Sequence, residues 1–172
     1  MPAEAGAARQ LEDLNASTNA GFAQAMAPFF EGAPRFLARL AASRPFRDDT
    51  DLFERAAAIA RAMPEDEQIE LVDAHPRIGA AAHSMSAASV AEQGRDAANR
   101  SVQADLDRLN AAYEERFGFR FVVFVAGRPR SEIVPLMEAR LGGERGTELG
   151  IALADVIAIA QDRWRKAGSR AW

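Results

Sequence analysis

The chain has 172 residues, of which 48% are hydrophobic, and this suits one compact domain with a sizeable core. The formal net charge of -4, the sequence pI near 5.3 and the lack of a basic cluster argue against a nucleic-acid or anionic-membrane partner. The chain contains no cysteine, which excludes disulfides and thiolate chemistry and suits a reducing cytosol.

The N-terminal residues and the hydropathy of the chain give expectations about boundaries and location. Residues 1–10 are alanine-rich and poor in large apolar groups, so we expect a flexible N-terminus followed by a single domain over residues 11–172. The N-terminus lacks the apolar stretch of a secretion signal, and no window approaches the ~18 apolar residues of a membrane span. We therefore expect a cytoplasmic protein, whose partner is either a small molecule or another protein.

Helix-forming residues dominate the chain, and proline and glycine mark the breaks between elements. Asp51 is the predicted N-cap of a helix, because Glu54 follows three residues later and an apolar stripe extends to Met63. Pro64 suits the first position of the next helix, which must stop near Pro76.

The middle of the chain is predicted to form a loop followed by two helices. Residues 77–88 are small and polar without periodicity, which is typical of a loop. Ser89 and Glu92 have the spacing of a capping box, so we expect Ser89 to open a helix. A later helix has an apolar edge that includes Tyr113, and Gly118 terminates it.

Residues 119–125, FRFVVFV, form the only strongly β-prone run in the chain. A lone strand leaves its backbone groups unsatisfied, so we predict an extended segment that crosses a helical core and has donors available to a ligand. A helix containing residues 133–140 and a long one over about 144–166 follow. The predicted fold is all-α, a single compact bundle-like helical domain with one extended segment near 119–125.

His75 is the first candidate for chemistry. It is one of two histidines and precedes Pro76, which pushes it out of helical dihedrals at the end of its helix. The negative end of the helix dipole favours the imidazolium form, which suits a group that delivers a proton or faces an anion. The alternative interpretation is a C-cap histidine that bonds the last helical carbonyls.

Ser89, Glu92 and Gln93 are the second candidates. The Ser-x-x-Glu spacing is usually a capping box and nothing more. Amides at a helix N-terminus also bind anions, so the same residues are a reasonable place for the polar groups of a substrate.

Arg163 is the third candidate. It follows Leu149 by fourteen residues and Val156 by seven, which places it on the apolar face of the last helix. An arginine that faces inward extends past the core to solvent, pairs with a structural acid or binds a ligand carboxylate, and the sequence leaves these alternatives open.

Other site chemistries find little support in the sequence. His75, His83 and Glu92 are the only metal ligands that can be imagined together, and there is no HExxH motif, so we expect no metal. Neither a P-loop nor a GxGxxG precedes a helix, and no GxSxG is present, which argues against nucleotide binding and serine hydrolysis.

Together these motifs resemble one family, the 2-oxo-4-hydroxy-4-carboxy-5-ureidoimidazoline (OHCU) decarboxylases. The resemblance extends from about Leu11 to Trp164, and its specificity comes from the order and spacing of short motifs. These are RPF at 44–46, AHPRIG at 74–79, SVAEQ at 89–93, LNAAYEERFGFRFVVFV at 109–125, and RLGG at 140–143 followed by EL at 148–149. Two departures are Arg120, where the family often has proline, and a short loop between Gly79 and Ser89.

The resemblance implies an all-α enzyme, often dimeric, that converts OHCU to (S)-allantoin and carbon dioxide in urate degradation without a metal or organic cofactor. It implies that His75 is the proton-transferring residue, and our own hypothesis is that Glu92 shares the catalytic work. The implied substrate-binding residues are Pro76, Ser89, Val90, Ala91, Glu92, Gln93, Phe121, Val122, Val123, Phe124, Val125 and Arg163.

Two competing interpretations belong to other classes of protein. In a non-catalytic helical binding module, His75 would be a cap and Arg163 a structural ion pair, and no pocket would lie between His75 and Glu92. A metal-assisted ureide or imidazoline hydrolase would need three converging ligands.

Overall fold

The computed structural model describes residues 2–80, 86–93 and 100–169, with the backbone alone at residues 2–8, 92–93 and 169. Within these ranges every regular element is a helix, as predicted. The elements are α1 (Pro2–Ala16), α2 (Asn19–Met26), the 3-10 helix η1 (Ala27–Phe29), α3 (Pro34–Ala42), α4 (Asp49–Ala62), α5 (Glu65–Asp73), α6 (Ala87–Gln93), α7 (Arg100–Phe117), α8 (Arg130–Arg140) and α9 (Arg145–Ser169).

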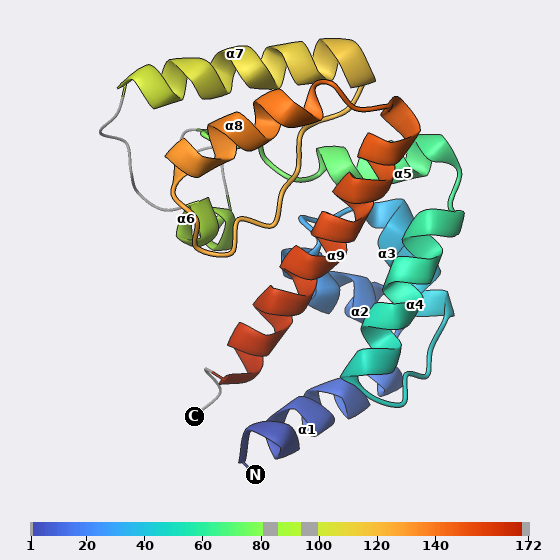
Figure 1. Ribbon diagram of the computed structural model, residues 1–172. Helices are drawn as coiled ribbons and strands as arrows, with labels where there is room; N and C mark the ends of the chain where they lie inside the picture. The colour runs from blue at the N-terminus through green and yellow to red at the C-terminus, as the bar shows by residue number, and fades with distance from the viewer. Residues whose placement is uncertain (1, 81–85, 94–99, 170–172) are drawn as a thin grey trace.

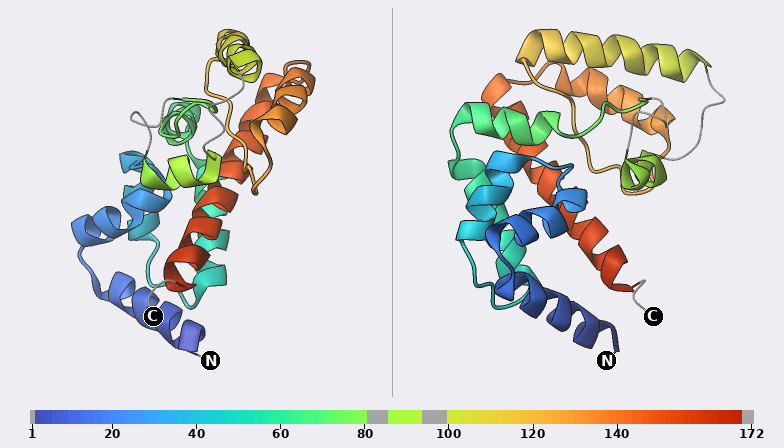
Figure 2. Two further views of the ribbon diagram at one scale, coloured as in Figure 1. Left: turned by 90° about the vertical axis from the view of Figure 1, so that its left-hand side faces the viewer. Right: turned by 180° about the vertical axis from the view of Figure 1, so that it is seen from behind.

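The long helix α9 is the centre of the fold. It packs against α1, η1, α4 and α5, and α7 pairs with α8 at the opposite end of the molecule from α1 (Figure 1). The apolar stripe predicted for α9 is buried, with Leu149, Leu153, Val156 and Ala160 all in the core. Figure 2 shows from two further sides that α9 runs from the α7–α8 end of the molecule toward α1.

The structure places residues 2–10, where we expected a flexible N-terminus, within α1. Leu11 and Leu14 on the same helix are buried against the core.

The start of α4 differs from the prediction. Asp48, rather than Asp51, is the N-cap, and its carboxylate accepts a hydrogen bond from the Asp51 amide at 2.8 Å. Asp51 lies in the first turn, where it is buried between Arg47 and Arg55. Aspartate favours the N-cap position, so both residues are candidates, and Asp51 instead forms ion pairs with Arg47 and Arg55.

The segment between α7 and α8 is extended and unpaired, as predicted. Gly118, with φ of +79°, ends α7 in the left-handed conformation that favours glycine. The aromatic rings of Tyr113, Phe117, Phe119 and Phe121 then pack together, with centroids 4.5 to 6.1 Å apart. This cluster packs the start of the extended segment against α7.

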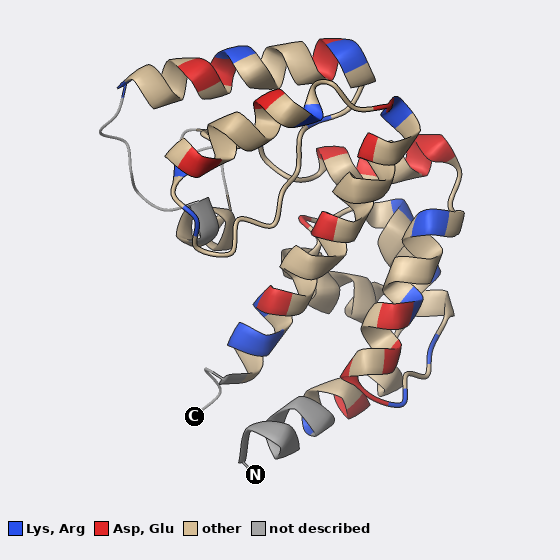
Figure 3. Ribbon diagram, viewed as in Figure 1, with Lys and Arg blue, Asp and Glu red and all other residues tan. Residues whose placement is uncertain are grey.

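Charged residues of both signs are interspersed along the described helices (Figure 3). Arg35 and Arg39 on α3, for example, pair with Asp66, Glu70 and Glu67 on α5. In the part of the chain that the structure describes, no helix is both long and apolar enough to cross a membrane.

Candidate active site

A cavity of about 410 Å³ opens where α5, α6 and α9 meet the extended segment. This volume is in the range of small-molecule sites. The cavity is lined by His75, Pro76, Ile78, Ser89, Ala91, residues 121–127, Ile159, Asp162, Arg163 and Lys166. It therefore brings His75, Arg163, part of α6 and the extended segment together, although they are far apart in the sequence.

His75 lies just beyond the end of α5 and is 3% exposed. Its Nδ1 lies 3.3 Å from the carbonyl oxygen of Leu71, which can only accept, so we assign the ring proton to Nδ1. The other ring nitrogen, Nε2, then carries a lone pair. It is buried and has no hydrogen-bond partner among the described residues. His75 thus bonds a helical carbonyl through one nitrogen and keeps the other available.

The charge state of His75 differs from the expectation. Burial lowers its pKa to about 4, and the positive charge of Arg163 adds to this effect, while Glu31 and the Leu71 carbonyl oppose it. Lowering the pKa of a histidine from its usual 6.5 to about 4 corresponds to about 3 kcal/mol, whereas the charge at a helix terminus contributes typically ~1 kcal/mol. Burial therefore outweighs the dipole, and His75 is neutral near pH 7.

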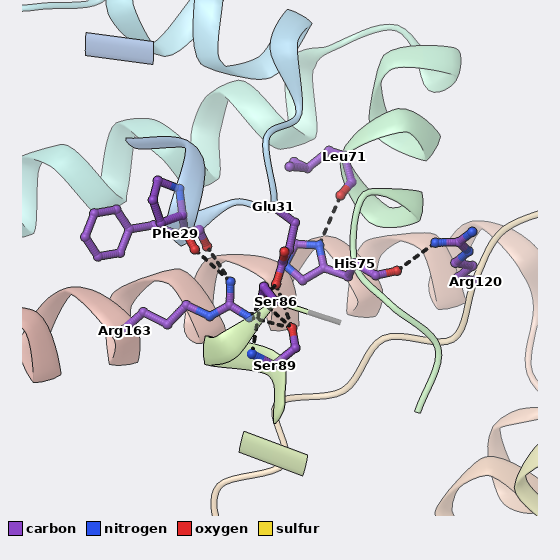
Figure 4. A network of polar contacts seen from close by, with 9 residues as sticks. Phe29, Glu31, Leu71, His75, Ser86, Ser89, Arg120 and Arg163 are labelled. Carbon is purple, nitrogen blue, oxygen red and sulfur yellow. Dashed lines mark hydrogen bonds and ion pairs between the residues drawn. The ribbon is translucent and has the colours of Figure 1, made fainter. Parts of the chain in front are cut away.

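Arg163 faces inward, as its place on α9 predicted, and is 7% exposed. Its Nη1 donates to the carbonyl oxygen of Pro28 at 2.9 Å, while Nη2 donates to Glu31 Oε1 at 2.9 Å and to Ser89 Oγ at 3.1 Å. Figure 4 shows these groups converging beside His75. A buried cation is thus placed at the cavity wall by several acceptors.

Glu31 was not singled out from the sequence. It follows η1 and has a φ of +53°, which is unusual for a residue with a side chain. Burial acts to raise its pKa, but hydrogen bonds from Ser89 and Ser86 and the charge of Arg163 outweigh this, so the pKa is lowered. The only local signal was an acid within the apolar run FFEGAPRF, which does not reveal its distant partners.

The start of α6 corrects the capping-box prediction. Ser86, not Ser89, caps this helix, because its Oγ accepts a hydrogen bond from the Ser89 amide at 3.1 Å. Ser89 lies within the first turn, is buried, and donates its hydroxyl to Glu31 at 2.6 Å. Its side chain therefore serves the site rather than the helix terminus.

The other residues of α6 that were predicted to bind substrate are Val90, Ala91, Glu92 and Gln93. Ala91 lines the cavity, and Val90 is not among the lining residues that the structure describes. Glu92 and Gln93 belong to α6, but their side chains lie outside the described part of the chain, as does His83.

The extended segment presents a free backbone edge. Successive residues of an extended chain direct their backbone groups to opposite sides. On one side, charged side chains bond the backbone. Asp73 bonds the backbone of Arg120, and Arg140 bonds that of Val122. Arg128 and Asp155 bond the backbone of Phe124. On the other side, Phe121 and Val123 line the cavity, and their backbone groups bond to no described residue.

Arg120 does not line the cavity. Its Nη1 donates to the carbonyl oxygens of Asp73 at 2.7 Å and His75 at 3.0 Å, so it binds the C-terminal end of α5 from the side away from the ring (Figure 4). The residue that departs from the usual proline thus fixes the backbone of His75.

In the part of the chain that the structure describes, the site combines a neutral imidazole whose Nε2 has no partner, a buried guanidinium and backbone amides without partners. This set can bind a small anion that carries amide-like groups and can move one proton. Within the described residues, no three His, Cys, Asp or Glu side chains are grouped as metal ligands.

Comparisons with known proteins agree with this chemistry. A family model described as OHCU decarboxylase matches residues 15–165. The 2-oxo-4-hydroxy-4-carboxy-5-ureidoimidazoline decarboxylase of Haloferax volcanii is 34% identical over 159 residues, which cover 89% of this chain and 92% of that protein. The uric acid degradation bifunctional protein PucL of Bacillus subtilis is 33% identical over 156 residues, and this chain spans only 31% of its length.

Two solved structures share the fold. A crystal structure of OHCU decarboxylase in the presence of (S)-allantoin matches with a TM-score of 0.65 and 24% identity, over 80% of this chain and 93% of that one. A crystal structure of (S)-allantoin synthase matches with a TM-score of 0.65 and 21% identity, over 90% of this chain and 52% of that one. Since the family model and the Haloferax relative both cover most of the sequence, the chain belongs to the OHCU decarboxylase family.

Proposed function

We propose that this protein converts OHCU to (S)-allantoin and carbon dioxide in urate degradation, with His75 as the proton-transferring residue and no metal or organic cofactor. The observation that carries the proposal is a buried imidazole whose Nε2 has no partner among the described residues, at the wall of a cavity that also contains Arg163. Family membership identifies the chemistry for which this arrangement is suited.

The substrate supplies its own electron sink. Ring carbon C4 of OHCU carries both the hydroxyl and the carboxyl group, and C5 is joined to nitrogen by a double bond. When the bond from C4 to the carboxylate breaks, its electron pair forms a C4–C5 double bond, and the former imine nitrogen takes up a proton. The resulting enol then loses the hydroxyl proton and gains one at C5, which gives allantoin. The protein needs to orient the substrate and direct these protons.

Arg163 and the extended segment are the orienting groups in this proposal. The guanidinium provides a fixed positive charge for an anionic substrate, and burial strengthens that attraction. The backbone groups of Phe121 and Val123 provide alternating donors and acceptors, which complement the amide edges of a ureide. Pro76, Val122, Phe124 and Val125 complete this wall in the proposal, together with Ser89, Ala91 and Gln93 from α6.

His75 both accepts and returns a proton. Because Nδ1 holds the ring proton against Leu71, Nε2 first acts as an acceptor, and the hydroxyl of the substrate is a suitable donor. An anionic substrate beside the ring also favours the imidazolium form. The protonated Nε2 then delivers its proton to one face of C5, and Glu92 assists this transfer. Delivery from one side accounts for a single enantiomer.

The roles of His75 and Glu92 can be tested by substitution. We expect His75→Ala and Glu92→Ala each to abolish the formation of optically active allantoin while the far-ultraviolet circular dichroism of the protein is unchanged. Full activity in either variant would refute that residue's catalytic role. Loss of the helical signal would support a structural role instead.

The competing interpretations lead to different observations. A binding module was expected to have a closed core near His75, whereas the structure has a cavity there. A metal-assisted hydrolase would lose activity to EDTA and regain it with zinc, whereas we expect EDTA to leave turnover unchanged.

The location, oligomeric state and partners of the enzyme are also part of the proposal. We infer a cytoplasmic enzyme that forms a homodimer and binds neither nucleic acid nor membranes. Sedimentation equilibrium tests the dimer, and a monomer at micromolar concentration would refute it.

A further inference from the structure

We propose that Glu31 is a positioning residue of the active site, which holds Arg163 and Ser89 in place and balances the positive charge that faces His75. This inference rests on the proposed decarboxylase function and assigns a role to a residue outside the cavity. It is carried by the hydrogen bonds of one carboxylate oxygen.

Glu31 Oε1 accepts three hydrogen bonds. The donors are Ser86 Oγ at 2.8 Å, Ser89 Oγ at 2.6 Å and Arg163 Nη2 at 2.9 Å. Ser89 Oγ also accepts from Arg163 Nη2, so the carboxylate, hydroxyl and guanidinium form a closed set of contacts. Such charge-assisted bonds are short and directional, which fixes the positions of their donors.

The donors belong to the elements that carry the site. Ser89 and Arg163 both line the cavity, whereas Glu31 does not, so Glu31 acts through them. Among the described residues, the side-chain hydrogen bonds that join α6 to other elements all lead to Glu31 or Arg163. Through Ser89, this carboxylate therefore links the described part of α6 to α9 and to the turn after η1.

The backbone at Glu31 has a conformation that is unfavourable for a residue with a side chain. Its φ of +53° places a residue with a Cβ in the left-handed region, which costs roughly 1–2 kcal/mol. Conformations of this cost persist where surrounding contacts impose them, and they concentrate at functional sites. Here the turn directs the Glu31 carboxylate toward α6 and α9.

The electrostatic consequence concerns His75. Among the described residues, the charged groups that act on its ring are Arg163, which lowers the pKa, and Glu31, which raises it. Arg120 reaches only the backbone carbonyl of His75. Loss of the Glu31 charge would remove a charge that opposes the effect of Arg163, which disfavours protonation of His75 at the step where it must hold a proton.

Glu31→Gln tests the inference because it removes the charge with little change in shape. We expect kcat/KM for OHCU to fall by about 100-fold, mainly because kcat falls. This is the size of effect that a displacement of catalytic groups by about 1 Å causes. Asp51→Asn is the matched control, because Asp51 is a buried acid paired with two arginines away from the cavity. It should lower the melting temperature comparably and leave kcat/KM unchanged. Equal activity losses in the two variants would overturn the inference.

A double-mutant cycle separates positioning from a general structural effect. If Glu31 acts through Arg163, Glu31→Gln should cause little further loss in kcat when Arg163 is already glutamine. Multiplicative losses from the two substitutions would contradict a shared role.

The titration of His75 gives a readout that needs no substrate. The chain has only two histidines, so the ring resonances can be followed by nuclear magnetic resonance and assigned with a His83→Gln variant. Glu31→Gln should shift the His75 midpoint to lower pH, and an unchanged midpoint would refute the electrostatic part of the inference. A wild-type protein that fails to consume OHCU would instead refute the proposed function, and the titration would still decide whether Glu31 acts on His75.

Discussion

Burial of His75 makes the stability of the protein depend on pH over a defined range. The pKa of His75 is lowered from 6.5 to about 4 in the folded state. Above pH 6.5 both states are neutral at this position. As the pH falls from 6.5 toward 4, the unfolded chain binds a proton that the folded protein does not, so the free energy of unfolding decreases. The lowering of the pKa corresponds to a loss of about 3 kcal/mol.

The assay is urea unfolding of the wild type and of His75→Asn at several pH values between 7 and 4. Asparagine cannot titrate but retains a donor near Nδ1 for the Leu71 carbonyl, so other titrating groups contribute equally to both proteins. The stability advantage of the wild type should shrink by about 3 kcal/mol across this range. A difference that stays constant with pH would refute the assignment of a buried, neutral His75.

Three further substitutions have defined outcomes. Arg163→Gln removes the cation that faces His75, so the pKa of His75 should rise from about 4 while turnover falls. An unchanged titration of His75 by nuclear magnetic resonance would show that Arg163 does not lower its pKa. Arg120→Ala releases two carbonyl oxygens at the end of α5 and should lower kcat/KM roughly 10-fold with unchanged circular dichroism; wild-type kinetics would exclude its positioning role. Tyr113→Phe removes a hydrogen bond to Glu148 and keeps the ring that packs on Phe121, and neither Tyr113 nor Glu148 lines the cavity, so it should cost about 1 kcal/mol in urea unfolding and leave turnover intact.

The fold was predictable because its signals are local and repeated. The apolar period of α9 placed Arg163 on the inner face, and the isolated β-prone run predicted an extended segment, since no second run could pair with it. Gly118 marked the end of α7 for the same local reason.

The errors arose where two neighbouring residues satisfied the same local rule. Ser86 and Ser89 are both possible caps for α6, as are Asp48 and Asp51 for α4. The sequence alone does not show which residue of each pair is the cap and which is buried. Ser89 bonds Glu31, which is 58 residues away in the sequence, whereas Asp51 pairs with Arg47 and Arg55, each four residues away from it.

Two properties of the site depend on the folded structure. Glu31 meets Ser89 and Arg163 across separations of 58 and 132 residues, so no local pattern reveals the contact. The neutrality of His75 likewise depends on burial by distant segments, whereas the helix terminus, which is visible in the sequence, has a smaller effect.

The most direct test of the account is the configuration of the allantoin formed from OHCU. The enol that follows loss of carbon dioxide is planar, so protonation by solvent has no preferred face and yields a racemate. With the wild-type protein, we predict rapid formation of allantoin with the circular dichroism of the (S) enantiomer, and no such signal with His75→Asn. Racemic allantoin that forms at the same rate with and without the protein would contradict the account.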